Sequence, residues 1–286
     1  MPSDRQLSLP FLPDWALQAI ERLQTGQETD LDCLWADPGR LFRACGMEPD
    51  PWQVDLLLSP AARLLVLCSR QAGKSEAAAT LALHTALLQP GALVLLLSPS
   101  ERQSGELAVK VFNLYDAAGR LVPATKRTAL QLSLANGSRV IALPSGEATV
   151  RGFSGAALLV IDEAARVPDE LYYAVRPMLA VSKGRFIALS TPFGKRGWFH
   201  EEWAWVKPDG SPRPPEEDPW RRTRIKAGDC PRIAAGFLAE ERAALGPRWF
   251  RQEYECSFED AVASLFAYED LMAACANDLK PLTLPE

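Results

Sequence analysis

Two groups of residues in this sequence have the types and the spacing to bind a triphosphate. The first is Ser69–Ser75, which reads SRQAGKS and follows the apolar run Leu64–Leu67. Gly73 allows the backbone to come close to a phosphate, and the N–H groups of such a loop point at the anion. Lys74 can neutralise the β- and γ-phosphates, and the Ser75 hydroxyl can ligate Mg²⁺. The pattern predicts a strand, a phosphate-binding loop and a helix whose N-terminus adds partial positive charge.

The loop is an incomplete Walker A motif. The complete motif has a glycine five residues before the second glycine, and Cys68 occupies that position here. A bare GK[ST] tripeptide occurs by chance in about one chain in seven of this length. The alternative interpretation is therefore a surface loop that carries an unrelated lysine. The flanking strand and helix, together with an acidic motif downstream, favour the phosphate loop.

The second group is an acidic pair at the end of a predicted buried strand. The strand covers Ala157–Ile161, and Asp162 and Glu163 follow it directly. Strand ends in a parallel sheet lie beside the phosphate loop, where Asp162 would hold Mg²⁺ through its water shell. Alternation along a strand predicts that Glu163 points the other way, where it could orient and deprotonate a water. The alternative role for the pair is capping of the segment that follows.

Further polar residues have positions that suit the same chemistry. Ser190 and Thr191 end the strand candidate Arg185–Leu189, and a hydroxyl there could sense the γ-phosphate; an ordinary Ser/Thr turn is the alternative. Arg151 lies in the glycine-rich loop PSGEATVRGFSG, as an arginine finger for a neighbouring site would. A surface ion pair is the alternative for Arg151.

A glutamine upstream of the loop could read a base. Pro49 and Pro51 predict an extended lead-in, followed by Trp52, Gln53 and an apolar helix. A glutamine amide can pair with both N6 and N7 of adenine. The alternative is a helix-surface glutamine with Trp52 in the core.

The elements that must position these groups form an α/β pattern with a parallel sheet. A second buried strand is predicted at Ala92–Ser98, followed by a helix that Ser100 and Gln103 cap and that runs to about Tyr115. Asn136-Gly137 predicts an antiparallel hairpin. The other expected elements are helices at 14–24, 31–45, 237–245, 247–254 and 268–275, and a basic strand at 220–226 whose edge faces either DNA or solvent.

Composition excludes several classes of function. The chain has 286 residues, 48% hydrophobic residues and a formal net charge of -5, so nucleic acid would have to be held by a local patch or an assembled ring. Six scattered cysteines without a CxxC pair, and only two histidines, argue against zinc and for free thiols in a reducing cytoplasm. We find no signal-peptide pattern and no long uncharged apolar run, and therefore expect no membrane association.

The order and spacing of these motifs resemble the ATPase domain of the large terminase subunit of tailed bacteriophages. The motifs are PWQ (Pro51–Gln53), SRQAGKS (Ser69–Ser75), SPSERQ (Ser98–Gln103), VRGFSG (Val150–Gly155), LLVIDEA (Leu158–Ala164), LSTPFGKRGWF (Leu189–Phe199) and the ending CPRI…FLAEERAALGPRWFRQEYECSF. The resemblance implies a RecA-like P-loop NTPase of the ASCE type, with a mostly parallel sheet and a small helical lid. We expect an N-terminal helical segment at 1–47, the ATPase domain at 48–258 and the start of a linker at 259–286.

The resemblance also implies roles, cofactors and partners. Arg70 would contact the γ-phosphate, Arg151 would act in trans, and Ser190-Thr191 would couple hydrolysis to motion. ATP and Mg²⁺ are the implied cofactors, and the implied nucleotide contacts are Trp52, Gln53, Ser69, Arg70, Gln71, Ala72, Gly73, Lys74, Ser75 and Glu76. The implied partners are double-stranded DNA, further copies of the chain in a ring, a portal protein and a small terminase subunit, in the cytoplasm of an infected bacterium.

One departure from the family pattern shapes the expected activity. The family normally continues into a nuclease domain with clustered acidic metal ligands, whereas this sequence stops at Glu286. We therefore expect ATP hydrolysis and translocation without DNA cleavage by this chain. Two alternatives stay open: a DExx-type helicase-like ATPase, since IDEA and STP resemble helicase motifs, and a non-catalytic module whose assembly depends on nucleotide.

Overall fold

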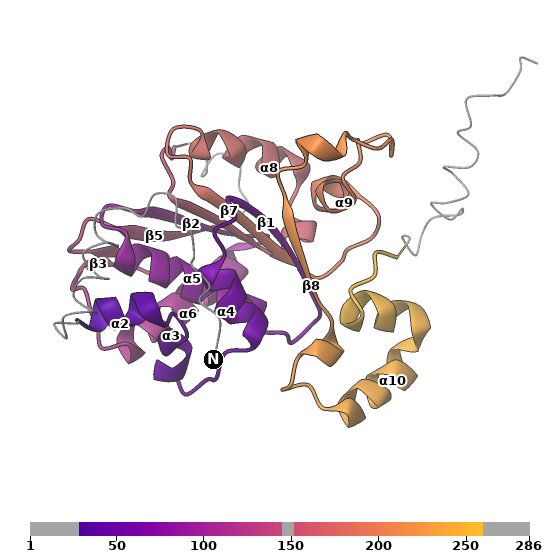
Figure 1. The fold of residues 1–286 in the computed structure, drawn as a ribbon, viewed down its shortest axis with the longest axis horizontal. Helices are drawn as coiled ribbons and strands as arrows, with labels where there is room; N and C mark the ends of the chain where they lie inside the picture. The colour runs from indigo at the N-terminus through magenta and orange to yellow at the C-terminus, as the bar shows by residue number, and fades with distance from the viewer. Residues whose placement is uncertain (1–28, 145–151, 260–286) are drawn as a thin grey trace, which may run out of the picture.

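The computed structural model describes residues 29–144 and 152–259 of the chain. Its centre is an eight-stranded sheet with the strand order β3-β4-β5-β2-β6-β7-β1-β8 (Figure 1). The strands are β1 (Arg63–Cys68), β2 (Leu93–Ser98), β3 (Ala124–Arg127), β4 (Gln131–Leu134), β5 (Arg139–Pro144), β6 (Leu158–Asp162), β7 (Arg185–Ser190) and β8 (Arg221–Ile225). In this spatial order, every neighbouring pair from β5 across to β8 is parallel. The pairs β3–β4 and β4–β5 at the other edge of the sheet are antiparallel.

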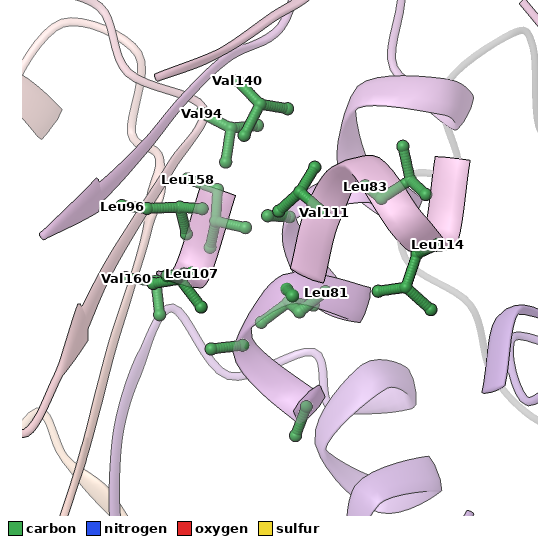
Figure 2. Packing of buried hydrophobic residues seen from close by; sticks show 14 of the residues in the cluster. Leu81, Leu83, Val94, Leu96, Leu107, Val111, Leu114, Val140, Leu158 and Val160 are labelled. Atoms are coloured by element: carbon green, nitrogen blue, oxygen red, sulfur yellow. The ribbon is translucent and has the colours of Figure 1, made fainter. Parts of the chain in front are cut away.

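The central strands are apolar because both faces of the sheet are covered. Alternate residues of β2 enter different cores: Val94 and Leu96 belong to one cluster, whereas Leu95 and Leu97 belong to the other. Figure 2 shows the first cluster, in which leucines and valines from two helices pack against side chains of β2, β5 and β6. Helices on both faces of a largely parallel sheet are the architecture predicted from the sequence.

The helices fall into three groups. The first cluster takes its helical side chains from α2 (Asp30–Ala36), α3 (Arg40–Ala44), α4 (Pro51–Leu58), α5 (Lys74–Leu88) and α6 (Glu101–Ala117). The opposite face is covered by α8 (Asp169–Val175) and α9 (Gly197–Ala204), with the 3₁₀ turns η1 (Ala164–Arg166) and η2 (Arg176–Leu179). The turn η3 (Pro215–Glu217) precedes β8 in the chain, whereas η4 (Ala227–Asp229) and α10 (Ala235–Tyr254) follow it, and α10 lies beside the sheet (Figure 1).

Most predicted elements within the described residues are confirmed, but one expected helix is wrong and β3, α8 and α9 were not predicted. The single helix expected at 31–45 is wrong: α2 ends at Ala36 and α3 starts at Arg40. Pro38 explains the break, because the residue before a proline is disfavoured in helical conformation, and Asp37 has φ −139° and ψ 86°. Strand β3 was not predicted, since its four residues are all exposed and show no apolar alternation.

Other predictions are confirmed in detail. The Asn136-Gly137 hairpin joins β4 to β5, and Ser100 caps α6 by accepting from the Gln103 N–H. The two helices expected at 237–245 and 247–254 form α10, which is broken at Gly246 (φ 74°, ψ 166°).

The basic strand β8 is only partly solvated. The Arg222 guanidinium donates to the Asp218 carboxylate at 2.6 Å and to the backbone carbonyls of Trp203 and Glu202. Arg221 beside it is exposed. The run is therefore partly structural, and a role in DNA contact stays a prediction.

Residues 14–24 and 268–275, where helices were predicted, lie outside the described residues. Within residues 29–144 and 152–259 we find no helix that is long and apolar enough to cross a bilayer. The predicted domain boundaries stay predictions. Leu34, Leu41 and Phe42 of α2 and α3 are nevertheless buried in the same core as α5 and α6.

Candidate functional site

The site is built at the carboxyl edge of three neighbouring parallel strands. Strand β7 lies between β1 and β6 and pairs with both. The loop after β1, the acidic pair after β6 and the hydroxyls after β7 therefore emerge at one edge, where α/β sheets place their ligands. The structure brings together Lys74, Ser75, Asp162, Glu163 and Thr191, although Ser75 and Asp162 lie 87 positions apart in the sequence and Glu163 and Thr191 lie 28 apart.

The N-terminal end of the phosphate loop is held by two backbone hydrogen bonds. The Ser69 N–H donates to the Ile225 carbonyl at 2.9 Å, and the Arg70 N–H donates to the Glu253 carbonyl at 2.8 Å. Gln71 and Gly73 have positive φ values of 60° and 84°. The loop leads directly into α5. The first-turn N–H groups of this helix have no partner within the helix and can bind an anion.

Ser75 and Asp162 form the closest contact between the loop and the acidic pair. The Ser75 hydroxyl donates to Oδ2 of Asp162 at 2.7 Å, while Oδ1 accepts from the Glu163 N–H at 3.0 Å. Asp162 is buried, and burial raises the pKa of its carboxyl, while the hydrogen bond from Ser75 opposes that rise. A hydroxyl and a carboxylate in contact are the hard oxygen donors that Mg²⁺ prefers.

Glu163 faces the same loop. Its Oε1 lies 3.6 Å from Nζ of Lys74, and Lys74 also donates to the Ser69 carbonyl at 3.4 Å. The prediction that Glu163 points away from Asp162 is wrong, because the strand ends at Asp162 and Glu163 adopts left-handed φ 52° and ψ 42°. Both carboxylates consequently contact adjacent residues at the start of α5. The Glu163 side chain caps no helix, contrary to the alternative role considered for it.

The two hydroxyls after β7 behave differently. Oγ1 of Thr191 lies 3.5 Å from Oε2 of Glu163, at the long limit of a hydrogen bond. Ser190 instead accepts from the Ala165 N–H at 3.0 Å and donates to the Thr191 carbonyl at 2.7 Å. Thr191 therefore faces the acidic pair, whereas Ser190 fixes the neighbouring backbone.

Gln53 does not lie on the helix surface. Its side chain is buried, so the helix-surface interpretation is wrong. Oε1 accepts from the Asp50 N–H at 2.8 Å, and Nε2 donates to the Gly73 carbonyl at 3.2 Å. The amide is thus bound to the phosphate loop itself, and adenine recognition stays a prediction. Trp52 is half-buried against the core, and its indole N–H has no protein partner.

Of the remaining predicted residues, Arg70 and Glu76 lie at the loop, and one lies outside the residues that the structure describes. The Arg70 side chain is 66% exposed, with Nε 3.3 Å from Oε2 of Glu253, so it is available at the mouth of the site. Glu76 forms an ion pair with Lys110 of α6. Arg151 lies outside the described residues.

Residues that sequence reasoning missed also contact this site. Arg232, which follows η4, donates to the Ala72 carbonyl, and Glu253 of α10 accepts from Arg70. Arg166 lies 3.8 Å from the Glu163 carboxylate. Arg232 and Glu253 belong to the CPRI and RQEY segments, whose motifs signalled the family but gave no chemical reason to assign a role.

A comparison with protein-family models now places the chain. Residues 65–273 match the model described as terminase large subunit, T4likevirus-type, N-terminal. The chain belongs to this family. Its membership favours the terminase interpretation over the helicase-like alternative.

Individual relatives agree. The chain is 26% identical over 259 residues to the terminase large subunit of Thermus virus P23-45, covering 82% of this chain and 53% of that protein. Its identity to the corresponding protein of Escherichia phage T5 is 27% over 217 residues, covering 74% of this chain and 48% of the relative. The chain thus spans about half the length of the curated relatives it matches.

Solved structures show the same fold. The ATPase domain of the Thermus phage P74-26 large terminase superposes with a TM-score of 0.63 at 22% identity, covering 76% of this chain and 96% of that domain. The large terminase of a thermophilic bacteriophage in complex with ADP gives a TM-score of 0.59 at 12% identity, covering 73% of this chain and 53% of that one. The fold is a RecA-like P-loop ATPase fold, as predicted.

Proposed function

We propose that this chain binds ATP with Mg²⁺ and hydrolyses it, as the ATPase domain of a motor that moves double-stranded DNA into a procapsid. The observation that carries the proposal is a double contact. Adjacent residues of α5, Lys74 and Ser75, meet the adjacent carboxylates Glu163 and Asp162. A cation, a hydroxyl and two carboxylates beside a helix N-terminus are the groups that phosphoryl transfer requires.

The residues present fit the proposed cofactors. The first turn of α5 offers backbone N–H groups to a phosphate, and Lys74 supplies positive charge at the same point. Ser75 and Asp162 offer oxygen ligands, and Mg²⁺ sites in such enzymes use one or two protein ligands plus phosphate and water. When bound, Mg²⁺ would neutralise charge on the β- and γ-phosphate oxygens. Support for the nucleotide also comes from the structures of the thermophilic bacteriophage's large terminase with ADP and with ATP-gamma-S.

Each side chain at the site has a separate proposed role in hydrolysis. Lys74 now contacts Oε1 of Glu163, and a triphosphate on the loop would draw its ammonium toward the phosphates. Oε1 is then free to accept a proton from an attacking water, while Oε2 stays near Thr191. We assign Glu163 as the general base and Thr191 as the residue that senses its state. Arg70 stands at the mouth of the loop, where its guanidinium could reach a γ-phosphate.

The partners follow from the proposed motor. Arg151 is proposed to complete a neighbouring subunit's site, which implies a ring of chains around the DNA. A portal protein and a small terminase subunit are the further proposed partners, in the cytoplasm of an infected bacterium. That this chain does not cleave DNA stays a prediction; within residues 29–144 and 152–259 no cluster of three or more metal-ligating side chains is found.

Phosphate release from Mg²⁺·ATP tests the proposal. We expect slow turnover by the purified chain, since the arginine from a neighbouring subunit contributes about 10³–10⁵ in rate in comparable enzymes. Lys74→Ala should abolish nucleotide binding and turnover. Lys126→Ala, on the exposed strand β3 at the far edge of the sheet, is the matched control and should behave as wild type.

The outcomes separate the remaining alternatives. ATP binding without any phosphate release, at all chain concentrations and with DNA added, would contradict the enzyme and support a non-catalytic assembly module. Strand displacement on a forked duplex would support a helicase-like activity instead.

A further inference from the structure

Two side chains from outside the phosphate loop, Arg232 and Gln53, donate hydrogen bonds to its backbone carbonyls. Nη2 of Arg232 donates to the Ala72 carbonyl at 3.1 Å, and Nε2 of Gln53 donates to the Gly73 carbonyl at 3.2 Å. Arg232 lies 160 residues from Ala72 in the sequence, in the segment between η4 and α10. Two consecutive carbonyls of the loop are therefore fixed by donors from different parts of the fold.

Fixing these carbonyls also fixes the N–H groups that a phosphate would use. In a trans peptide, the C=O of one residue and the N–H of the next point in opposite directions. A donor on the Ala72 carbonyl therefore turns the Gly73 N–H away from Arg232, and the bond to the Gly73 carbonyl does the same for the Lys74 N–H. Among the described residues, neither N–H donates to a protein acceptor.

Arg232 is itself held by a buried carboxylate. Its Nη2 lies 2.7 Å from Oδ2 of Asp50, and its Nε lies 3.3 Å from Oδ1, so the pair is bidentate. The Asp50 side chain is 5% exposed, and Asp50 is the N-cap residue of α4, the helix that carries Gln53. One guanidinium thus joins α4, the phosphate loop and the segment leading into α10.

The fit around Gly73 shows how closely the two donors approach. A Cβ at Gly73 would lie 2.8 Å from Nε2 of Gln53 and 2.9 Å from Nη2 of Arg232, and its φ of 84° disfavours a side chain as well. Only glycine allows both donors to reach the loop here.

We propose that Arg232 is a positioning residue that, with Asp50 and Gln53, holds the phosphate loop in its anion-binding shape and ties that shape to the segment leading into α10. The proposal rests on the proposed function, because the anion is taken to be the triphosphate of ATP. It assigns Arg232 no contact with the nucleotide.

Asp50→Asn can change the affinity for ATP in either direction, and the direction distinguishes a positioning role from a purely electrostatic effect. Removing a negative charge near an anionic ligand strengthens binding if only electrostatics matters. If Asp50 holds Arg232 in place, its loss instead weakens ATP binding. We expect Asp50→Asn to weaken the affinity for a fluorescent ATP analogue about three- to tenfold and Arg232→Gln about tenfold or more, the usual range for a lost charge-assisted hydrogen bond.

Two further variants sharpen the test. Arg232→Lys keeps the charge, but one ammonium cannot hold Asp50 and the Ala72 carbonyl as the planar guanidinium does; we expect it to resemble Arg232→Gln. Arg242→Gln is the matched control, since Arg242 lies in α10, is 62% exposed and pairs with Glu255 rather than with a residue of the loop. It should bind within about twofold of wild type. The double variant Asp50→Asn/Arg232→Gln should be no weaker than Arg232→Gln alone.

Amide hydrogen exchange in the nucleotide-free chain provides a readout that does not depend on ATP. We expect residues 69–77 to exchange faster in Arg232→Gln than in wild type, and Arg242→Gln to leave them unchanged. Unaltered exchange in Arg232→Gln, or Asp50→Asn binding that is equal to or tighter than wild type, would overturn the proposal. A wild-type chain that binds no ATP would refute the proposed function, while the exchange measurement would still decide the positioning role.

Discussion

Replacing Glu163 with glutamine should change nucleotide binding and turnover in opposite directions. Glu163 is 24% exposed, and its Oε1 lies 3.6 Å from Nζ of Lys74, which is 8% exposed. At that distance, two unit charges attract by about 4–5 kcal/mol at an effective dielectric of 20, before the cost of desolvation. Lys74 must give up this contact to reach a phosphate, so the carboxylate competes with ATP for the lysine.

The glutamine variant removes the competition but also removes the base. Because desolvation offsets most of the attraction, we expect ATP to bind about three- to tenfold more tightly to Glu163→Gln. Phosphate release should fall about 10²–10⁴-fold, the contribution of a general base. Titration with a fluorescent ATP analogue measures the first effect, and single-turnover phosphate release measures the second.

The control is Glu170→Gln, the same change at an exposed position of α8, which should alter neither quantity. Turnover by Glu163→Gln at the wild-type rate would refute Glu163 as the base. Weaker ATP binding by the variant would refute the competition for Lys74.

Two further predictions concern stability. Burial raises the pKa of Asp162, so wild type loses stability as the pH rises through that pKa. Asp162→Asn should therefore need more urea than wild type to unfold at pH 7, with a smaller gain in acid. No gain at pH 7 would contradict this reasoning. Burial, with Arg185 nearby, lowers the pKa of His84 to about 4. Wild type should therefore lose about 1–3 kcal/mol between pH 6.5 and 4, since only the unfolded chain takes up the proton there. His84→Gln should lose less stability than wild type between pH 6.5 and 4. If wild type and His84→Gln lost the same stability over this range, the assignment of the loss to His84 would be contradicted.

Local patterns predicted the elements that carry the site. The apolar runs of β1, β2, β6 and β7 required burial on both faces, which is why each was recognised as a strand of a parallel sheet. Glycine and proline marked the break within α10, and Asn136-Gly137 marked the hairpin. The expected convergence of the phosphate loop with the residues after β6 and β7 followed from this topology alone, because parallel strands end at one edge.

Backbone conformation at single residues was harder to predict. Strand alternation predicted a direction for Glu163 that its left-handed φ of 52° reverses, and the identity of the residue gives no sign of that conformation. Pro38 did carry a signal, yet the apolar spacing around it suggested one continuous helix, and steric restriction at Asp37 prevailed.

The sequence by itself determined the family, the sheet and the residues that meet at the phosphate loop, because those depend on order and on local pattern. Only the tertiary structure decided what Gln53 and Arg232 contact. Arg232 meets Asp50 across 182 residues of chain and Ala72 across 160, and no periodicity or motif specifies such a distance. Those contacts exist because β8 returns the chain to the edge beside β1, and from there the next residues can reach the back of the phosphate loop.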